Sequence, residues 1–270
     1  MSMNVAPSPN SASEIAMRVL VTFAVEAEFA PWRRLRNLRE IKIGEITAYQ
    51  AQIGRAQVDF VITGMGMENA RRVSETVLDV PYQFCVTAGF AGALGEEHAI
   101  RDILVAESVR ELGKSQTLQC SRNLAYAARD NGAKLVKMFL TSNQVISAAA
   151  EKKRLAPFAD AVEMESFAIL TAAHHRKRAV VAIRVISDSM LNEVPAEVST
   201  MVDEKGQVKI GGVVRYVARH PLQLPTLLRL GRDSRTAAEA LAHFLEAFIK
   251  KLSFSSHGWP PAELQEVAAR

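Results

Sequence analysis

The sequence predicts an α/β protein with a central mixed β-sheet flanked by helices. Short apolar runs of strand length alternate with segments of helical length along most of the chain. The run over residues 179–186 is β-branched nearly throughout, as expected of a strand that is covered on both faces. With 270 residues, of which 49% are hydrophobic, the chain is long enough to bury a sizeable core.

The first elements are a strand, a helix and a hairpin. Residues 17–23 form a β-rich apolar run, and the glutamates that follow favour a helix as far as about Arg36. Two runs that alternate in polarity, 46–53 and 57–63, lie on either side of Gly54 and predict a hairpin.

Two glycine-containing segments follow the hairpin. The segment 64–66 opens a helix over residues 68–78, and a strand over 84–88 runs into Gly89 and Gly92. The alternation then continues with strands at 102–107, 135–140 and 161–164 and helices at 123–130, 147–155 and 165–173.

We expect a single domain over residues 17–252, in which 190–252 form a C-terminal loop and helical extension. Residues 1–16 are polar and lack the apolar core of a signal peptide, which predicts a flexible leader. Residues 253–270 contain one glycine and two prolines and predict a frayed tail.

The composition argues against several classes of protein. The net charge of +4 is only mildly basic and aromatic residues make up 6%, so we expect no nucleic-acid partner. Cys85 and Cys120 lack the spacing of metal ligands and indicate a reducing, cytoplasmic compartment. We expect neither a metal ion nor a cofactor. No run has the length and apolarity needed to span a bilayer.

Polar or glycine-rich segments lie where four of the expected strands end. Glu28 follows the first strand, residues 63–66 the third, residues 87–92 the next, and Asp188 the last. The carboxyl ends of strands in an open α/β sheet form the usual ligand crevice. Four distant segments that converge on one edge therefore predict a site there.

The glycines of these segments have two interpretations. Gly64 and Gly66 precede a helix and suit either a tight turn or amide donors to an anion or a sugar oxygen. The same choice applies to Gly89 and Gly92. Taken alone, the tight turn is the simpler interpretation.

The acidic residues likewise have structural and functional interpretations. Glu28 and Asp188 suit helix caps as well as a site. Glu163 and Glu165 are two positions apart, so they cannot point the same way on a strand or a helix. At most one of them faces the site, and the other is structural or solvent-facing. A pair such as Glu165 and Asp188 can bind sugar hydroxyls and deliver a proton, which favours an enzyme over a binding module.

With these segments the chain resembles the purine nucleoside phosphorylase and nucleosidase superfamily, especially its methylthioadenosine/S-adenosylhomocysteine nucleosidase branch. The matching pieces occur in the family's order and spacing and cover about residues 17 to 190. They are A-V-E-A-E at 24–28, T-G-M-G at 63–66, T-A-G-F-A-G-A-L at 87–94, V-E-M-E-S at 162–166 and R-V-I-S-D at 184–188.

The resemblance implies a three-layer, nucleoside phosphorylase-like fold with a twisted, partly barrel-like sheet, and cleavage of a purine N-glycosidic bond. Asp188 matches the general acid at purine N7, Glu28 the carboxylate that orients the attacking water, and Glu165 the residue that holds the ribose hydroxyls. A free Asp has a pKa near 4, so burial or hydrogen bonding is expected to keep its proton. Further substrate contacts are implied for Met164, Val162, Gly64, Gly89, Phe90, Ala88, Val145 and Ser187.

Departures from the family pattern bear on the nucleophile and on the base. Phosphorylases of the superfamily hold phosphate with an Arg and a Ser where this chain has Thr87 and Phe90. Phosphate would lose charge-assisted hydrogen bonds there and be repelled by Glu28, so we expect water as the nucleophile. Val145 stands where the methylthioadenosine enzymes have an aromatic residue that stacks on adenine, so tight stacking is not expected.

The segment 219–234 is a third departure, because the methylthioadenosine branch has no such extension. It resembles the hopanoid-associated nucleosidases, which implies a lipid-linked adenosyl substrate such as adenosylhopane and a peripheral membrane contact. From physical reasoning alone, an amphipathic helix that covers the sheet is the alternative.

The favoured function is hydrolysis of a 5′-modified adenosine with release of adenine. The alternatives are an adenosylhopane nucleosidase, a phosphate-dependent purine nucleoside phosphorylase, and a non-catalytic nucleoside-binding protein. Members of the family usually form dimers or larger assemblies, so the expected partners are a small nucleoside and a second copy of the chain.

Overall fold

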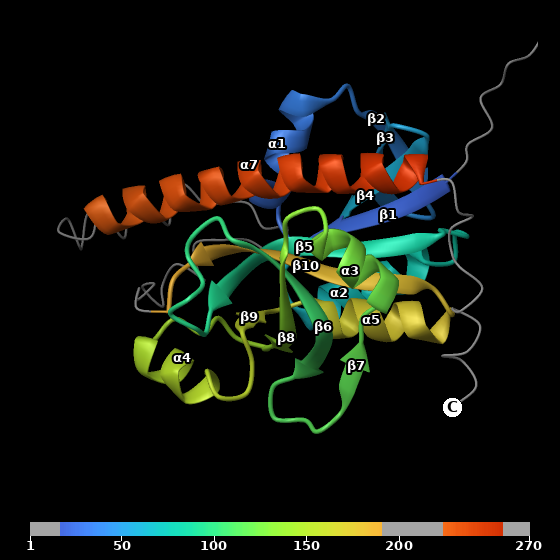
Figure 1. Ribbon diagram of the computed structural model, residues 1–270. Coiled ribbons are helices and arrows are strands. Elements are labelled where there is room, and N and C mark those ends of the chain that lie inside the picture. Colours follow the sequence, from blue (N-terminus) through green and yellow to red (C-terminus); the bar gives the residue numbers. More distant parts are fainter. Residues whose placement is uncertain (1–16, 191–223, 256–270) are drawn as a thin grey trace, which may run out of the picture.

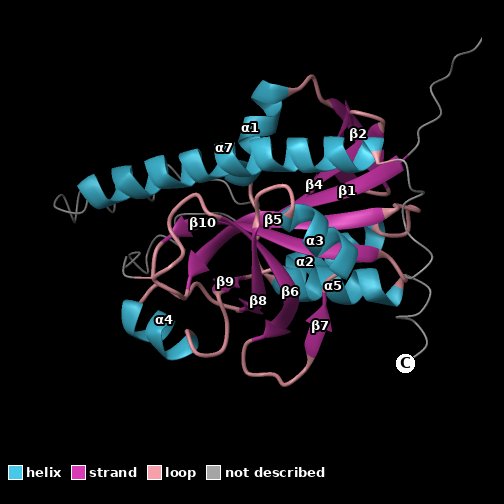
Figure 2. Ribbon diagram, viewed as in Figure 1, coloured by secondary structure: helices cyan, strands magenta, loops and turns pink. Residues whose placement is uncertain are grey.

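The computed structural model describes residues 17–190 and 224–255 of the chain. Within these residues ten strands form one mixed sheet, and helices lie on both of its faces (Figures 1 and 2). The α/β class and the central mixed sheet predicted from the sequence are confirmed.

The elements follow the predicted order closely. The strands are β1 (Met17–Phe23), β2 (Arg39–Ile43), β3 (Ile46–Ile53), β4 (Ala56–Ile62), β5 (Phe84–Ala93), β6 (Ile103–Glu111), β7 (Thr117–Gln119), β8 (Lys134–Thr141), β9 (Ala161–Glu163) and β10 (Ala179–Asp188). The helices are α1 (Glu26–Leu35), α2 (Met67–Val77), α3 (Arg122–Arg129), α4 (Ala149–Leu155), α5 (Ser166–His175) and α7 (Leu224–Phe254).

Four parallel strands set the edge where the site was predicted. β1 pairs with β4 on one side and with β5 on the other, and β5 pairs with β10, all in parallel. Parallel strands run toward the same edge of a sheet, so the segments that follow β1 and β4 and the carboxyl-terminal parts of β5 and β10 converge there. The predicted convergence of four distant segments is therefore confirmed.

The sheet also closes on itself around β5. Neighbouring strands run from β5 through β9, β8, β6 and β10, and β10 returns to β5. Closure leaves these strands without free edges. It also places β9 and β10, which carry Glu163 and Asp188, on either side of the same strand. The partly barrel-like sheet expected from the family resemblance is confirmed.

Helices cover the two faces of the sheet. α1 and α7 pack together on one side, and α2 and α5 pack together on the other (Figure 1). α7 also contacts β5 and β10. Its buried residues recur every three or four positions and form one apolar stripe: Ala237, Ala238, Leu241, Ala242, Leu245, Phe248, Ile249 and Leu252. The described part of the C-terminal extension is thus an amphipathic helix that covers the sheet.

The structure corrects three local predictions. β2 and β7 were not predicted, because β2 is a mostly exposed strand at the edge of the sheet and β7 has only three residues. β5 does not end at residue 88 but continues to Ala93. Gly89 and Gly92 therefore lie inside a strand, paired with Arg184 and Asp188, and not in a turn.

Some predicted segments lie outside the described residues. These are the leader 1–16, the segment 191–223, which holds the start of the unusual extension, and residues 256–270. α7 continues through Phe254, slightly past the predicted domain end at residue 252. Among the described residues, no helix combines the length and apolarity that crossing a membrane requires.

A buried ion pair joins the elements that meet at the predicted site. Arg184 of β10 donates a hydrogen bond to Glu163 Oε2 of β9 at 2.6 Å, and their side chains are 1% and 0% exposed. The same guanidinium nitrogen donates to Ser166 Oγ at the start of α5, at 2.8 Å, and to Thr87 Oγ1 of β5, at 3.2 Å. One cation therefore links two strands of the parallel core with β9 and α5.

Glu163 in turn holds the first turn of α5. Its Oε2 accepts the backbone N–H groups of Glu165 and Ser166 at 3.0 and 2.8 Å, and its Oε1 accepts the Thr141 hydroxyl. A carboxylate at a helix N-terminus satisfies the unpaired N–H groups there. Burial by itself would raise the pKa of Glu163, but Arg184 and these donors hold the pKa below its ordinary value.

The substitution Glu163→Gln should strongly destabilise the fold. It removes the counter-charge of a buried guanidinium, a change that typically costs about 3–5 kcal/mol. Urea unfolding followed by circular dichroism measures the loss. Glu26→Gln is the matched control, because Glu26 pairs with Arg33 at an exposed position and should cost less than about 1 kcal/mol. Equal urea midpoints for Glu163→Gln and the unsubstituted chain would contradict the assigned role.

Candidate active site

Glu28 lies in the first turn of α1, directly after β1, and is 4% exposed. Its Oε2 accepts the backbone N–H groups of Ala24 and Val25 at 2.7 and 3.0 Å, so it caps its own helix as one interpretation proposed. Its Oε1 reaches across to β5 and accepts the N–H of Phe90 at 2.7 Å. The helix cap and the position at the site are therefore compatible.

Glycines of β5 make room for the carboxylates. A Cβ on Gly89 would lie 2.5 Å from Glu28 Oε1, and a Cβ on Gly92 would lie 3.0 Å from Asp188 Oδ2. A larger residue at position 89 would displace Glu28 from the Phe90 amide. Gly89 and Gly92 are three residues apart, and a strand rises about 3.3 Å per residue, so Glu28 and Asp188 approach β5 at points about 10 Å apart along the strand.

Glu165 is the N-cap residue of α5, and its side chain is buried. Its Oε1 accepts the N–H of Gly66 at 2.8 Å, which joins α5 to the loop before α2. Burial, and next the charge of Glu163, raise the pKa of Glu165 to about 8, while the charge of Arg184 acts in the opposite direction. This carboxyl therefore keeps its proton to a higher pH than a free glutamate does.

The pKa of Glu28 is also set by burial and by neighbouring groups that oppose it. Burial raises the pKa of Glu28 above its ordinary value, and the N–H of Phe90 and the charge of Arg184 limit the rise. The Arg184 guanidinium therefore acts on Glu28 and Glu165 as well as on Glu163. Glu163 is not solvent-facing but structural, one of the two roles left open by the sequence.

Asp188 ends β10, and its side chain is 16% exposed. Its Oδ2 accepts a hydrogen bond from the Lys152 ammonium of α4, and its Oδ1 accepts the Ser187 hydroxyl at 3.2 Å. Lys152 is 0% exposed and also donates to the Ser189 carbonyl at 2.9 Å. This buried ion pair with Lys152 was not expected from the sequence.

The other residues predicted to contact the substrate differ in how far they are buried. Ala88 lies in β5 and Val162 in β9, and both are buried, while Phe90 and Met164 are partly buried. Val145 is 43% exposed in the segment between β8 and α4. Its side chain is therefore available to a ligand, as its predicted role requires.

The backbone amides of the 64–66 segment already have protein partners. The N–H of Gly64 donates to the Ala24 carbonyl at 3.1 Å, and that of Gly66 donates to Glu165. Both glycines have positive φ angles, 89° and 88°, a conformation that glycine adopts at little cost. In this structure the segment is thus a tight turn that positions Glu165, and the donation of its amides to a ligand stays a prediction.

Lys152 and Arg184 were not assigned roles from the sequence. A lone arginine inside an apolar strand is a signal of a buried ion pair, because charges are almost never fully buried without a partner. Lys152 carries no such signal, since it stands among charged residues at 151–154 that suggest a solvent-exposed helix.

The raised pKa of Glu165 makes stability depend on pH. The unfolded chain releases this proton near 4.5 and the folded chain near 8, so the contribution of Glu165 to the free energy of unfolding falls as pH rises from 4.5 through 8. Glu165→Gln, which does not titrate, should reduce that fall. Urea midpoints on either side of neutral pH measure it, with the exposed Glu68→Gln as control. If the urea midpoint of Glu165→Gln fell with pH as steeply as that of the unsubstituted chain, the raised pKa of Glu165 would be refuted.

Comparisons with known proteins find nucleosidases among the relatives of this chain. A 5′-methylthioadenosine/S-adenosylhomocysteine nucleosidase of Desulfotalea psychrophila is 26% identical over 214 residues, which are 70% of this chain and 92% of that protein. The corresponding enzyme of Staphylococcus epidermidis is 25% identical over 183 residues, 58% of this chain and 79% of that protein.

Solved structures show the same fold at lower identity. A futalosine hydrolase mutant of Helicobacter pylori strain 26695 aligns with a TM-score of 0.67 at 16% identity, over 87% of this chain and 99% of that chain. The 5′-methylthioadenosine/S-adenosylhomocysteine nucleosidase of Neisseria meningitidis, in complex with methylthio-immucillin-A, aligns with a TM-score of 0.66 at 20% identity, over 87% and 99%. The sequence model of the Phosphorylase superfamily matches residues 18–218, well over half of the chain, and the protein therefore belongs to that superfamily.

Proposed function

We propose that this protein hydrolyses the N-glycosidic bond of a purine nucleoside, with a 5′-modified adenosine as its substrate. The contact that carries the proposal joins Glu28 Oε1 to the N–H of Phe90 at 2.7 Å. It lies in the segment that phosphorylases of this superfamily use to bind phosphate. A carboxylate there occupies the amide donor and repels an anion, which supports water as the nucleophile.

The choice of substrate class rests on the relatives. Both curated relatives carry the name of a nucleosidase for 5′-methylthioadenosine and S-adenosylhomocysteine, two adenosines modified at the 5′ carbon. The motifs around Glu28, Glu165 and Asp188 match that branch of the superfamily. These observations support adenine as the leaving base.

The placement of the acids supports one orientation of the nucleoside. Glu28 and Glu165 act on each other electrostatically and lie together, whereas Asp188 lies about 10 Å further along β5. The ribose fits beside the two glutamates and the purine beside Asp188. Glu165, with a proton on its carboxyl, can both donate to and accept from the ribose hydroxyls.

The reaction then needs one base and one acid. The N9–C1′ bond breaks with its electron pair leaving on the purine, and the oxygen of water bonds to C1′. Glu28 takes the proton that water loses, for which a raised pKa is favourable. The Lys152 ammonium supplies the proton that Asp188 passes to N7, which leaves Lys152 as the neutral amine.

Hydrolysis predicts release of adenine that does not depend on phosphate. The test incubates the purified chain with methylthioadenosine, S-adenosylhomocysteine, futalosine, adenosine and a lipid-linked adenosine, each with and without phosphate. The free purine base of each substrate that is cleaved, and the free sugar, should form at equal rates in both conditions. A rate that requires phosphate, with a sugar 1-phosphate as product, would identify a phosphorylase. Binding without release from any substrate would identify a nucleoside-binding protein.

Loss of the proton relay should lower kcat, and because Lys152 is 0% exposed and paired with Asp188, the urea midpoint of each variant is measured first to establish that it folds. Asp188→Asn and Lys152→Met should each lower kcat about 100-fold or more, because a positioned acid contributes about 100- to 10,000-fold. The matched control for Lys152→Met is Lys153→Met, an exposed neighbour on the same helix.

A second substrate separates proton delivery from a structural role. The nitrophenolate of a nitrophenyl riboside leaves without being protonated, so it should be released by both variants at close to the unsubstituted rate. An equal loss on both substrates would show that Lys152 only supports the fold. An unchanged kcat on the purine substrate in Asp188→Asn would refute the assignment of the acid.

A further inference from the structure

His98 is a buried histidine outside the candidate active site. Its side chain is 6% exposed, and neither ring nitrogen has a hydrogen-bond partner among the described residues. Two carboxylate oxygens face its Nε2, Glu97 Oε1 at 3.4 Å and Asp160 Oδ1 at 3.9 Å. Buried polar nitrogens are rarely left without a partner, so the site lacks an atom that His98 can bind.

The spacing of these atoms suits ligands of one metal ion. Zinc bonds to nitrogen and oxygen at about 2.0–2.1 Å, so two ligands at the tetrahedral angle lie about 3.4 Å apart. The two measured separations lie at and slightly above that value, and the three ligand atoms lie within 4.8 Å of one another. The Glu97–His98 separation fits as it stands, and the His98–Asp160 separation exceeds the value by about 0.5 Å, which a small side-chain shift on binding would remove.

Neighbouring residues hold the side chains of two of the ligands, Asp160 and Glu97, in position. Asp160 Oδ2 accepts the N–H of Met138 at 3.0 Å, which orients the carboxylate and leaves Oδ1 toward His98. Such outer contacts typically orient metal ligands. Glu97 folds back over Gly95, where a Cβ would lie 2.3 Å from Glu97 Oε1. A side chain at position 95 would therefore force Glu97 out of this position.

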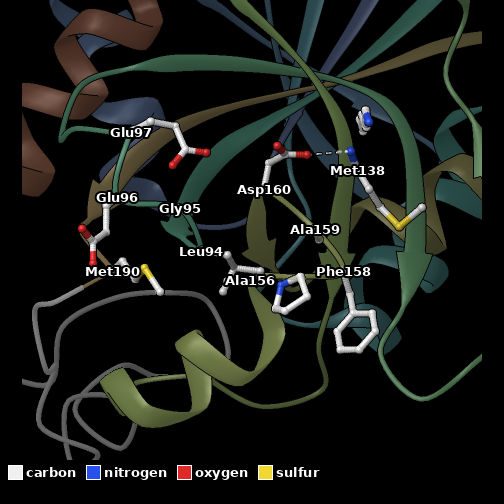
Figure 3. Close-up of a pocket in the computed structure, with 12 residues that line it drawn as sticks. Leu94, Gly95, Glu96, Glu97, Met138, Ala156, Phe158, Ala159, Asp160 and Met190 are labelled. Carbon is white, nitrogen blue, oxygen red and sulfur yellow. Dashed lines mark hydrogen bonds between the residues drawn. The ribbon is translucent and has the colours of Figure 1, made fainter.

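The cluster opens onto a cavity of about 450 Å³. Glu97 and Asp160 both line this cavity, and Figure 3 shows their carboxylates turned toward each other across it. A bound ion would therefore have protein ligands on one side and room for water on the other. Two carboxylates and a neutral imidazole carry a charge of −2, which matches a divalent cation.

We infer that Glu97, His98 and Asp160 form a binding site for a divalent transition-metal ion, of which Zn²⁺ best suits the imidazole and carboxylate ligands. The ion joins the segment between β5 and β6 to the residue before β9. The same two segments already meet where the N–H of Leu94 donates to the Asp160 carbonyl at 3.0 Å. The site is structural, and it does not depend on the proposed hydrolase activity.

The test is a calorimetric titration of the full, metal-free chain with Zn²⁺ and with Mg²⁺ at neutral pH. One equivalent of Zn²⁺ should bind and raise the melting temperature, whereas Mg²⁺, which prefers all-oxygen sites, should not compete. His98→Phe and Asp160→Asn should each weaken Zn²⁺ binding at least tenfold. The matched control is His175→Gln, an exposed histidine on α5, which should leave the affinity unchanged.

Glu97→Gln is the variant that should fold normally, because the Glu97 side chain is 69% exposed. It should weaken Zn²⁺ binding while leaving the urea midpoint of the metal-free chain unchanged. Absence of Zn²⁺ binding by the unsubstituted chain would overturn the inference and leave His98 with only the two carboxylates as neighbours. Undiminished binding by His98→Phe or by Glu97→Gln would place the ion elsewhere and overturn it as well.

Discussion

The hydrogen-bonded ion pair between Arg184 and Glu163 is the interaction on which the site depends. A buried guanidinium loses the hydration it has in water, and it is stable here because a carboxylate and two hydroxyl oxygens replace that water. Its charge also reaches Glu28 and Glu165. Without this cation, three acidic groups would lie together in the protein interior with no counter-charge from β10.

The closed part of the sheet brings Arg184 and Glu163 together. β5 lies between β9 and β10, so residues from positions near 90, 163 and 188 meet although they are far apart in the chain. Glycine at positions 89 and 92 lets Glu28 and Asp188 approach the strand itself. The two acids then have different surroundings. Glu28 accepts hydrogen bonds from backbone amides, and Asp188 accepts one from the ammonium of a buried lysine. The proposed roles of Glu28 as base and Asp188 as acid rest on this difference.

Much of the fold could be predicted because its signals are local. β1 and β3 have the predicted bounds, since their apolar and alternating patterns come from strands in a covered sheet. β2 and β7 lack such a pattern and owe their conformation to pairing with β3 and β6. In the candidate site, Glu28, Glu165 and Asp188 could be located from motifs. Lys152 could not, because a charged helix segment gives no sign that one of its lysines points inward.

The sequence by itself determined the α/β class, the order of most elements and the set of acidic residues at the ends of parallel strands. These follow from hydrophobic periodicity and from motifs, which are properties of short segments. Only the tertiary structure decided the protonation and partners of those acids, the role of Glu163 as a helix anchor, and the burial of His98 between two carboxylates. Each depends on the distance between charges in different segments and on the exclusion of water around them, and neither quantity is defined until the chain has folded.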